Sequence, residues 1–204
     1  MNHSIKLLAA GAVFTIASAG AHATWFTDEA SFLAAIDGTY YLENFDGWSF
    51  GNPLGGDLTW SAPGGNGYGW DAAASNGLYS LPGGLSTNSP EDPIDFTFTG
   101  APVTAFGMNL SDTDFDGNFI PGDVTLDLSN GQSNTLTVGA NETFVGWVGN
   151  DVLTSASIVA VSAADDYVLA DHVYTGAAPV PEPASMVALA LGAGALLRRR
   201  AKKA

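Results

Sequence analysis

The stretch VTLDLSNGQSNTLTV, from Val124 to Val138, decides the fold class. Its first half places an apolar side chain at every second position, which is the period of a β-strand with one face against a core. Asn130-Gly131 follows, and this dipeptide favours the tight turn of a β-hairpin because both residues tolerate positive φ. A second short run, 135–138, comes after the turn. The stretch therefore predicts an antiparallel hairpin.

The same pattern recurs along the body of the chain. Ile94, Phe96 and Phe98 alternate with polar residues in another clear example. Many short strands separated by Gly- and Asn-rich turns favour an antiparallel β-sandwich, jelly-roll-like in its connections. The runs expected to form strands are 39–45, 94–99, 103–110, 124–128, 135–138, 143–148, 156–161 and 167–174.

One short helix is expected near the start of this mainly β body. Thr27 is its expected N-cap, the helix covers residues 28–36 with two acidic side chains in the first turn, and Gly38 marks its end. The stretch 47–84 is rich in Gly, Ser, Asn and Trp, so it is expected to form long ordered loops rather than strands.

Charge is distributed unevenly over the 204 residues. Residues 24–180 contain twenty Asp or Glu side chains and no Lys or Arg, while five of the six cations lie in the last seven residues and the sixth is Lys6. Such a body repels nucleic acid and anionic lipid and attracts divalent cations. Nucleic acid is therefore excluded as a partner. An equally open interpretation is that the acidic side chains serve only to keep the protein soluble.

The chain has no cysteine, so no disulfide can stabilise the domain. Packing, alone or together with a bound metal, must therefore hold the domain together.

Residues 1–23 have the three parts of a secretory signal peptide. Lys6 precedes an uncharged apolar run, and small residues end at Ala21-His22-Ala23, an A-x-A cleavage pattern. The mature chain is then expected to begin at Thr24. The alternative, a buried N-terminal helix, is disfavoured because no capping residue precedes it.

The C-terminal segment reads as a membrane anchor. The run 184–197 has fourteen uncharged residues, fewer than the roughly 20 of an ordinary membrane-spanning helix, but it carries no polar stripe and a basic tail follows it at once. Cationic residues favour the cytoplasmic side. We therefore predict a hydrophobic transmembrane helix over 184–197, with the C-terminus in the cytoplasm and the body exported.

The same segment resembles the PEP-CTERM sorting signal of Gram-negative, exopolysaccharide-producing bacteria. Pro181-Glu182-Pro183, a short apolar helix and the cluster Arg198-Arg199-Arg200 occur in the order of that signal. The resemblance implies recognition by an exosortase-type enzyme in the inner membrane, removal of the tail, and delivery to the cell surface or extracellular matrix. The expected domains are a signal peptide (1–23), a β-sandwich ectodomain (24–178) and the sorting signal (179–204).

The body also resembles ectodomains found ahead of such signals, over most of residues 26–176. The stretches that carry this likeness include FTDEASFLAAI, GDVTLDLSNG and FVGWVGNDVLTSASIVAV. The resemblance supports the sandwich and implies no activity.

The segment DTDFDGNFIPGD, 112–123, holds the sharpest pattern for chemistry. Acidic residues occupy its positions 1, 3, 5 and 12, and Gly117 occupies position 6, as in Ca²⁺ loops. Alternate carboxylates can converge on an ion that takes six to eight oxygens. The final Asp is shorter than the usual Glu, and the flanking strands argue against an EF-hand; a solvated acidic turn is the alternative. The predicted ligands of a structural Ca²⁺ are Asp112, Asp114, Asp116, Asp123 and, on a later strand, Asp171.

Asp171 belongs to this set through its place in the strand 167–174. It shares a strand face with Leu169 and Val173. If that face is the core, its carboxylate needs a partner or a metal; in the opposite register it points to solvent.

Aromatic rings within 47–84 are candidates for contact with exopolysaccharide. Flat rings can stack on sugar rings, and the alternative is that they cover the core under long loops. The candidates are Trp48, Trp60, Tyr68 and Trp70, with Tyr79 nearby.

Catalytic patterns are weak. His172 is the only histidine of the exported part, so a Ser-His-Asp triad would depend on it alone, and no zinc or phosphate-loop pattern occurs. We predict a non-catalytic surface or matrix protein, structural or glycan-associated. The alternative is a secreted glycan-degrading enzyme that uses paired carboxylates.

Overall fold

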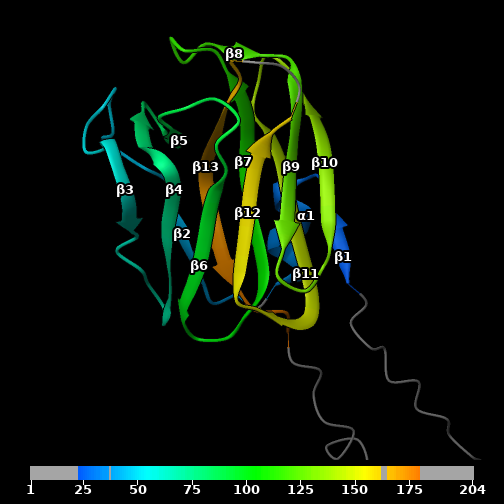
Figure 1. Cartoon of the computed structure of the whole chain (residues 1–204). Helices are drawn as coiled ribbons and strands as arrows, with labels where there is room; N and C mark the ends of the chain where they lie inside the picture. Colours follow the sequence, from blue (N-terminus) through cyan, green and yellow to red (C-terminus); the bar gives the residue numbers. More distant parts are fainter. Residues whose placement is uncertain (1–22, 37, 162–164, 180–204) are drawn as a thin grey trace, which may run out of the picture. The chain divides into compact units, whose positions relative to one another are not determined.

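The computed structural model describes residues 23–36, 38–161 and 165–179. Strands account for most of these residues, and one short helix lies near the N-terminus (Figure 1). The elements are β1 (Thr24–Phe26), α1 (Glu29–Ala35), β2 (Tyr40–Glu43), β3 (Gly55–Ser61), β4 (Tyr68–Leu81), β5 (Gly84–Thr87), β6 (Ile94–Gly100), β7 (Val103–Thr113), β8 (Phe119–Ile120), β9 (Gly122–Leu128), β10 (Ser133–Val138), β11 (Thr143–Leu153), β12 (Ser155–Ala160) and β13 (Tyr167–Gly176).

The described strands form one curled antiparallel sheet. Its order is β1-β11-β7-β13-β5-β4-β6-β12-β9-β10, with β2, β3 and β8 paired to β13, β4 and β7. The curl brings β4, β6, β12, β9 and β10 in front of β13, β7 and β11, while β5 pairs with both β13 and β4 and so joins the two layers (Figure 1). Phe96 on β6 and Phe106 on β7 meet with their ring centroids 5.7 Å apart. The predicted mainly β sandwich is confirmed.

The hairpin predicted from the opening stretch is present. Ser133 pairs with Asp127 at its closed end and Val138 with Gly122 at its open end. Gly131 has a φ of +83°, and its amide donates to the carbonyl of Leu128 at 2.9 Å. The alternating apolar residues of β9 are buried, as their period indicates.

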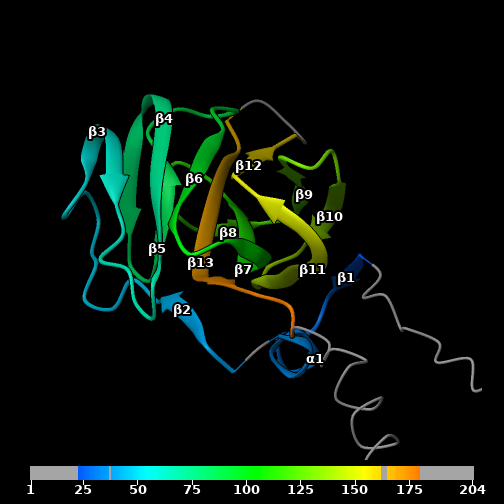
Figure 2. The same cartoon turned by 90° about the horizontal axis from the view of Figure 1, so that it is seen from below.

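Two hydrophobic clusters hold the domain together. The larger cluster includes Trp70, Phe96 and Trp147, which are almost fully buried. The smaller one includes Phe32 of α1 together with Phe144 and Tyr174, and α1 lies beside the edge that β1 and β11 form (Figure 2). The helix therefore closes an apolar face that strands leave uncovered.

The N-cap of α1 differs by one residue from the prediction. Asp28, not Thr27, has the extended φ of −137° of a cap, and its Oδ1 accepts from the Ser31 amide at 2.8 Å. A carboxylate satisfies the free amides of a first turn and also interacts favourably with the helix dipole.

The prediction of loops over 47–84 is wrong. This stretch contains β3, the fourteen-residue β4 and the start of β5. Small residues such as Ala72 and Ala74 have weak strand propensity, but both are buried, and Ala72 pairs with Trp60 of β3 and Phe96 of β6. Tertiary packing therefore outweighs local composition here.

In the described ranges, no helix is long and apolar enough to span a bilayer. The predicted helix over 184–197 and residues 1–22 of the predicted signal peptide lie outside those ranges.

Packing under α1 gives a direct test of the smaller cluster. Phe32 is 0% exposed and its ring lies 5.4 Å from that of Phe144 and 6.0 Å from that of Tyr174. Phe32→Ala should lower the free energy of unfolding by about 3–5 kcal/mol, because the cavity cannot close fully. Urea denaturation of the purified chain measures this loss. Leu58→Ala, at a side chain 60% exposed, should change it by less than about 0.5 kcal/mol, and equal losses would contradict the assignment.

Candidate functional site

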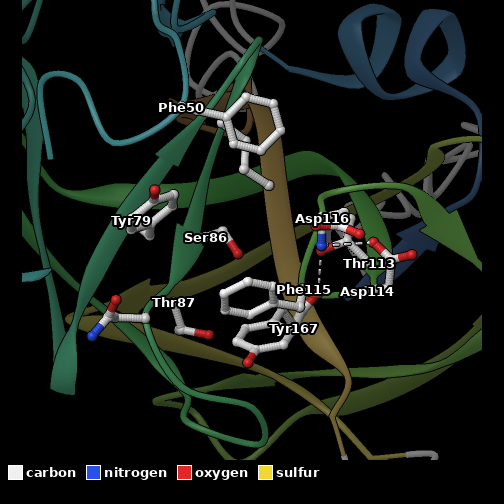
Figure 3. Close-up of a pocket in the computed structure, with 11 residues that line it drawn as sticks. Phe50, Tyr79, Ser86, Thr87, Thr113, Asp114, Phe115, Asp116 and Tyr167 are labelled. Carbon is white, nitrogen blue, oxygen red and sulfur yellow. Dashed lines mark hydrogen bonds between the residues drawn. The ribbon is translucent and has the colours of Figure 1, made fainter. Parts of the chain in front are cut away.

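A groove of about 350 Å³ lies where the ends of β4, β5, β7 and β13 meet (Figure 3). Aromatic rings surround it: Phe50 precedes β3, Tyr79 belongs to β4, Phe115 follows β7 and Tyr167 begins β13. Phe115 is 82% exposed and Phe50 is 54% exposed. Phe115 and Tyr167 are also edge to face, with ring centroids 6.3 Å apart. Exposed large rings beside a hollow mark an interaction site more than a packing site.

The turn after β7 fixes the position of Phe115. The Asp114 Oδ1 accepts from the backbone amides of Asp116 and Asn118, each at 2.9 Å, and the Asn118 side chain donates to Oδ2 at 3.0 Å. These hydrogen bonds, first those from Asn118, hold the pKa of Asp114 below its usual range. The carboxylate thus stays ionised and organises a tight turn that points an aromatic ring outward.

Glycine allows the two exposed rings to approach the same groove. Gly117 has a φ of +77°, and a Cβ there would lie 3.1 Å from the Phe50 ring. Phe50 therefore packs against the backbone of the turn that carries Phe115. A side chain at position 117 would be strained and would displace the ring.

Hydroxyl and amide groups line the floor of the groove. Ser86 donates to the carbonyl of Val168 at 2.9 Å, and Thr113 donates to that of Tyr167 at 3.1 Å. Thr87, Asn88 and Asp116 complete the polar lining. Hydroxyl oxygens that donate to the backbone can still accept a hydrogen bond, so the floor offers acceptors next to the rings.

The aromatic residues predicted to contact glycan lie elsewhere, except Tyr79. Trp48, Trp60 and Trp70 form a row of edge-to-face contacts, with neighbouring ring centroids 5.0 and 5.3 Å apart. Trp70 is 1% exposed, and Trp48, Trp60 and Tyr68 are partly buried against the main cluster. Their packing is that of rings that cover the core, which was the alternative interpretation.

The predicted calcium ligands are distributed over several elements. Asp112 is buried at the end of β7, Asp114 and Asp116 belong to the turn, Asp123 on β9 accepts from Thr137 at 2.7 Å, and Asp171 is on β13. No three acidic or histidine side chains among the described residues lie close enough to hold one metal ion. Calcium binding stays a prediction, and the twelve-residue spacing does not converge on one point.

Asp171 is buried and has a partner. His172 donates its backbone amide to Oδ1 at 2.6 Å, and its Nδ1 lies 2.7 Å from Oδ2. The register of β13 against β7 shifts between Asp171 and Tyr174. His172 lies in this irregular part of the strand with a φ of +47°, and its ring contacts the adjacent Asp171. Burial raises the pKa of Asp171, and the hydrogen bonds of His172 oppose that shift. Burial and then the charge of Asp171 raise the pKa of Glu142 nearby.

Asp112 lacks such a partner among the residues that the structure describes. It is 0% exposed, and neither of its carboxylate oxygens has a hydrogen bond within that part of the chain. Burial, followed by the charge of Asp166, raises its pKa to about 7. Asp112 was predicted as a calcium ligand of the acidic loop; its side chain is buried at the end of β7, and its role as a ligand stays a prediction.

Sequence reasoning missed Phe50, Phe115 and Tyr167 as groove residues. One signal was available: Phe115 stands between aspartates in a turn, where a ring has nothing local to pack against. The meeting of Phe115 with Phe50 and Tyr79 depends on strand order, which no local pattern contains.

Comparisons with known proteins identify the C-terminal segment and give distant structural likenesses. Residues 179–201 match the PEP-CTERM protein-sorting motif, which confirms the resemblance found in the sequence. No curated protein sequence matches the chain. A mutant of a family 29 carbohydrate-binding module is similar in structure, with 11% identity over 71% of this chain and 99% of the module and a TM-score of 0.42.

Two larger proteins are similar over part of their length. A family two carbohydrate esterase from Cellvibrio japonicus is 10% identical over 80% of this chain and 36% of its own, with a TM-score of 0.34. A rhamnosidase from Klebsiella oxytoca, solved with rhamnose bound, is 11% identical over 75% of this chain and 32% of its own, with a TM-score of 0.35.

The raised pKa of Asp112 gives a pH prediction for the metal-free protein. An unfolded Asp titrates near 4, so between about pH 4 and pH 7 the folded state holds a proton that the unfolded state has lost. Stability should therefore fall as the pH rises through this window and level off above it. Melting curves in a chelator from pH 5 to pH 8 measure the slope. Asp112→Asn should reduce it, since Glu142 and Asp171 supply the remainder; an unchanged slope would refute the assignment.

Proposed function

We propose that this protein is exported, processed at its sorting signal by an exosortase-type enzyme, and retained at the cell surface or in the extracellular matrix, where its β-sandwich binds glycan without catalysis. The sorting motif at residues 179–201 supports the route. The groove between Phe50 and Phe115 is the observation that carries the binding role.

Exposed aromatic rings suit sugar rings because the flat face of an aromatic ring packs against the apolar C–H face of a sugar ring. A ring that remains in water in the free protein gains contact area when a sugar covers it, while the polar floor can satisfy the sugar hydroxyls. Phe115 and Phe50 supply the faces, and Ser86, Thr87 and Asn88 supply hydrogen-bonding groups between them. A groove of this composition fits an extended neutral chain.

The charge of the groove limits the class of glycan. Asp114 is ionised and Asp116 lies beside it, and residues 24–180 contain no Lys or Arg that could pair with an acidic sugar. Like charges repel, and the repulsion grows near protein. The proposed ligand is therefore a neutral polysaccharide or one that carries amino groups. The lowered pKa of Asp114 also makes it a hydrogen-bond acceptor, whereas a glycosidase acid needs a raised pKa.

A binding screen on the purified chain tests the groove. Phe115→Ala should weaken binding to a neutral polysaccharide about tenfold, because the loss of one stacking ring removes roughly 1–1.5 kcal/mol. Affinity electrophoresis with dissolved polysaccharides measures the change. Val152→Ala removes another exposed apolar side chain, 56% exposed, and should bind like the wild type.

Other outcomes would overturn parts of the proposal. If Trp48→Ala abolishes binding and Phe115→Ala does not, the ligand lies on the row of tryptophans. Release of reducing ends during incubation would favour the glycan-degrading enzyme. Binding of acidic polysaccharides in chelator would refute the charge argument.

The sorting route makes a separate prediction. Glu182→Gln, or deletion of residues 198–200, should leave unprocessed protein in the inner membrane, because both changes remove features that define the sorting signal. Fractionation followed by immunoblotting measures the full-length and trimmed forms. Normal surface delivery of both variants would contradict the proposed route.

A further inference from the structure

The buried acidic side chains of the domain differ in how their charge is satisfied. Among the described residues these are Asp92, Asp112, Asp166 and Asp171. Asp92 accepts from the backbone amide of Asn76 at 2.7 Å, and Asp171 pairs with His172. Asp112 has no hydrogen bond to either oxygen from any residue in the described ranges. An isolated buried carboxylate is far too costly to persist without a partner, a proton or a cation.

Strand register places Asp166 next to Asp112. Asp112 pairs directly with Val168 on β13, and Asp166 lies two positions before Val168. Asp166 directly precedes β13, and its charge acts on the buried Asp112, so the two side chains are neighbours. Asp166 is 5% exposed, and its backbone carbonyl accepts from the amide of Glu91. Two carboxyl groups therefore lie together inside one end of the sandwich.

The chain itself has no cation to place between them. Residues 24–180 contain no Lys or Arg, and the single histidine of that range, His172, is bonded to Asp171. We propose that Asp112 and Asp166 bind a divalent cation of the calcium type, which joins the end of β7 to the start of β13.

The chemistry of the pair selects the ion. A divalent cation neutralises two carboxylates, whereas a shared proton or a sodium ion neutralises one. Calcium accepts carboxylates, backbone carbonyls and water in flexible geometry. Magnesium demands a near-ideal octahedron and gives up its water reluctantly, so it suits an interior site less well.

This site is distinct from the acidic loop that the sequence predicts. The two share Asp112, but Asp114 is bonded within its own turn and Asp123 is bonded to Thr137. The ligand that the sequence pattern lacks is Asp166, which is remote in sequence and adjacent in the sheet. The two sites therefore require different residues, and substitutions can separate them.

The test is a melting experiment on the purified full chain, first stripped with a chelator. Calcium at 100 times its Kd should raise Tm by about 5–10 °C, beyond the rise given by NaCl of equal ionic strength, and magnesium should do less. Isothermal titration should show one calcium ion bound per chain. Equal shifts with CaCl₂ and NaCl would overturn the proposal. So would a calorimetric titration that detects no bound calcium, since this would leave a shared proton as the partner.

Single substitutions locate the ion. Asp112→Asn and Asp166→Asn should each abolish the calcium-specific shift and the titration signal, and Asp112→Asn should raise the metal-free Tm because the repulsion is gone. Asp127→Asn removes an exposed carboxylate from β9 and should keep the full response. If Asp116→Asn abolishes the shift while Asp166→Asn retains it, the ion lies in the loop and the proposal is wrong.

Discussion

The absence of Lys and Arg from residues 24–180 is the constraint on which the rest of the structure depends. With no side-chain cation except a histidine available, carboxylates must be satisfied by backbone amides, hydroxyls or amides of side chains. Asp28 caps α1, Tyr174 donates to Glu29, and Tyr41 donates to Glu43. The first bond joins an acid to a backbone amide and the other two join acids to tyrosine hydroxyls, so acidic side chains help to fix the start of α1 and the end of β2.

The groove follows from the same constraint. Because Asp114 accepts hydrogen bonds from its own turn, the turn is tight, and a tight turn at the end of β7 leaves Phe115 no interior to enter. The left-handed Gly117 then lets Phe50 lie against it. The hydrogen bonds that satisfy the Asp114 carboxylate therefore also position the exposed rings of Phe115 and Phe50 beside the polar floor of the groove.

Local sequence patterns were enough to predict most of the fold, but they predicted little of the candidate site. The hairpin at Asn130-Gly131 follows from period and turn chemistry, both of which are local. The sequence did not predict strand β4, because its small residues have weak strand propensity and the strand is stabilised by pairing with β3 and β6. The groove and the Asp112–Asp166 pair join residues that are distant in the chain, and the sheet order that brings them together cannot be inferred from any short window of the sequence.

The position of the cations has a consequence for the mature protein. The full chain carries a net charge of −15, from 21 acids and 6 cations, whereas residues 24–180 alone hold twenty acids and no Lys or Arg, a net of −20 with neutral histidine. Trimming at the proposed site would therefore raise the charge density of the domain at the moment it leaves the membrane. Repulsion over a Debye length of about 8–10 Å keeps copies apart and also opposes compactness, and both effects weaken when a divalent ion binds. If the proposed ion binds at the buried carboxyl pair, it relieves more repulsion there than at the surface, since screening by solvent is weakest in the interior.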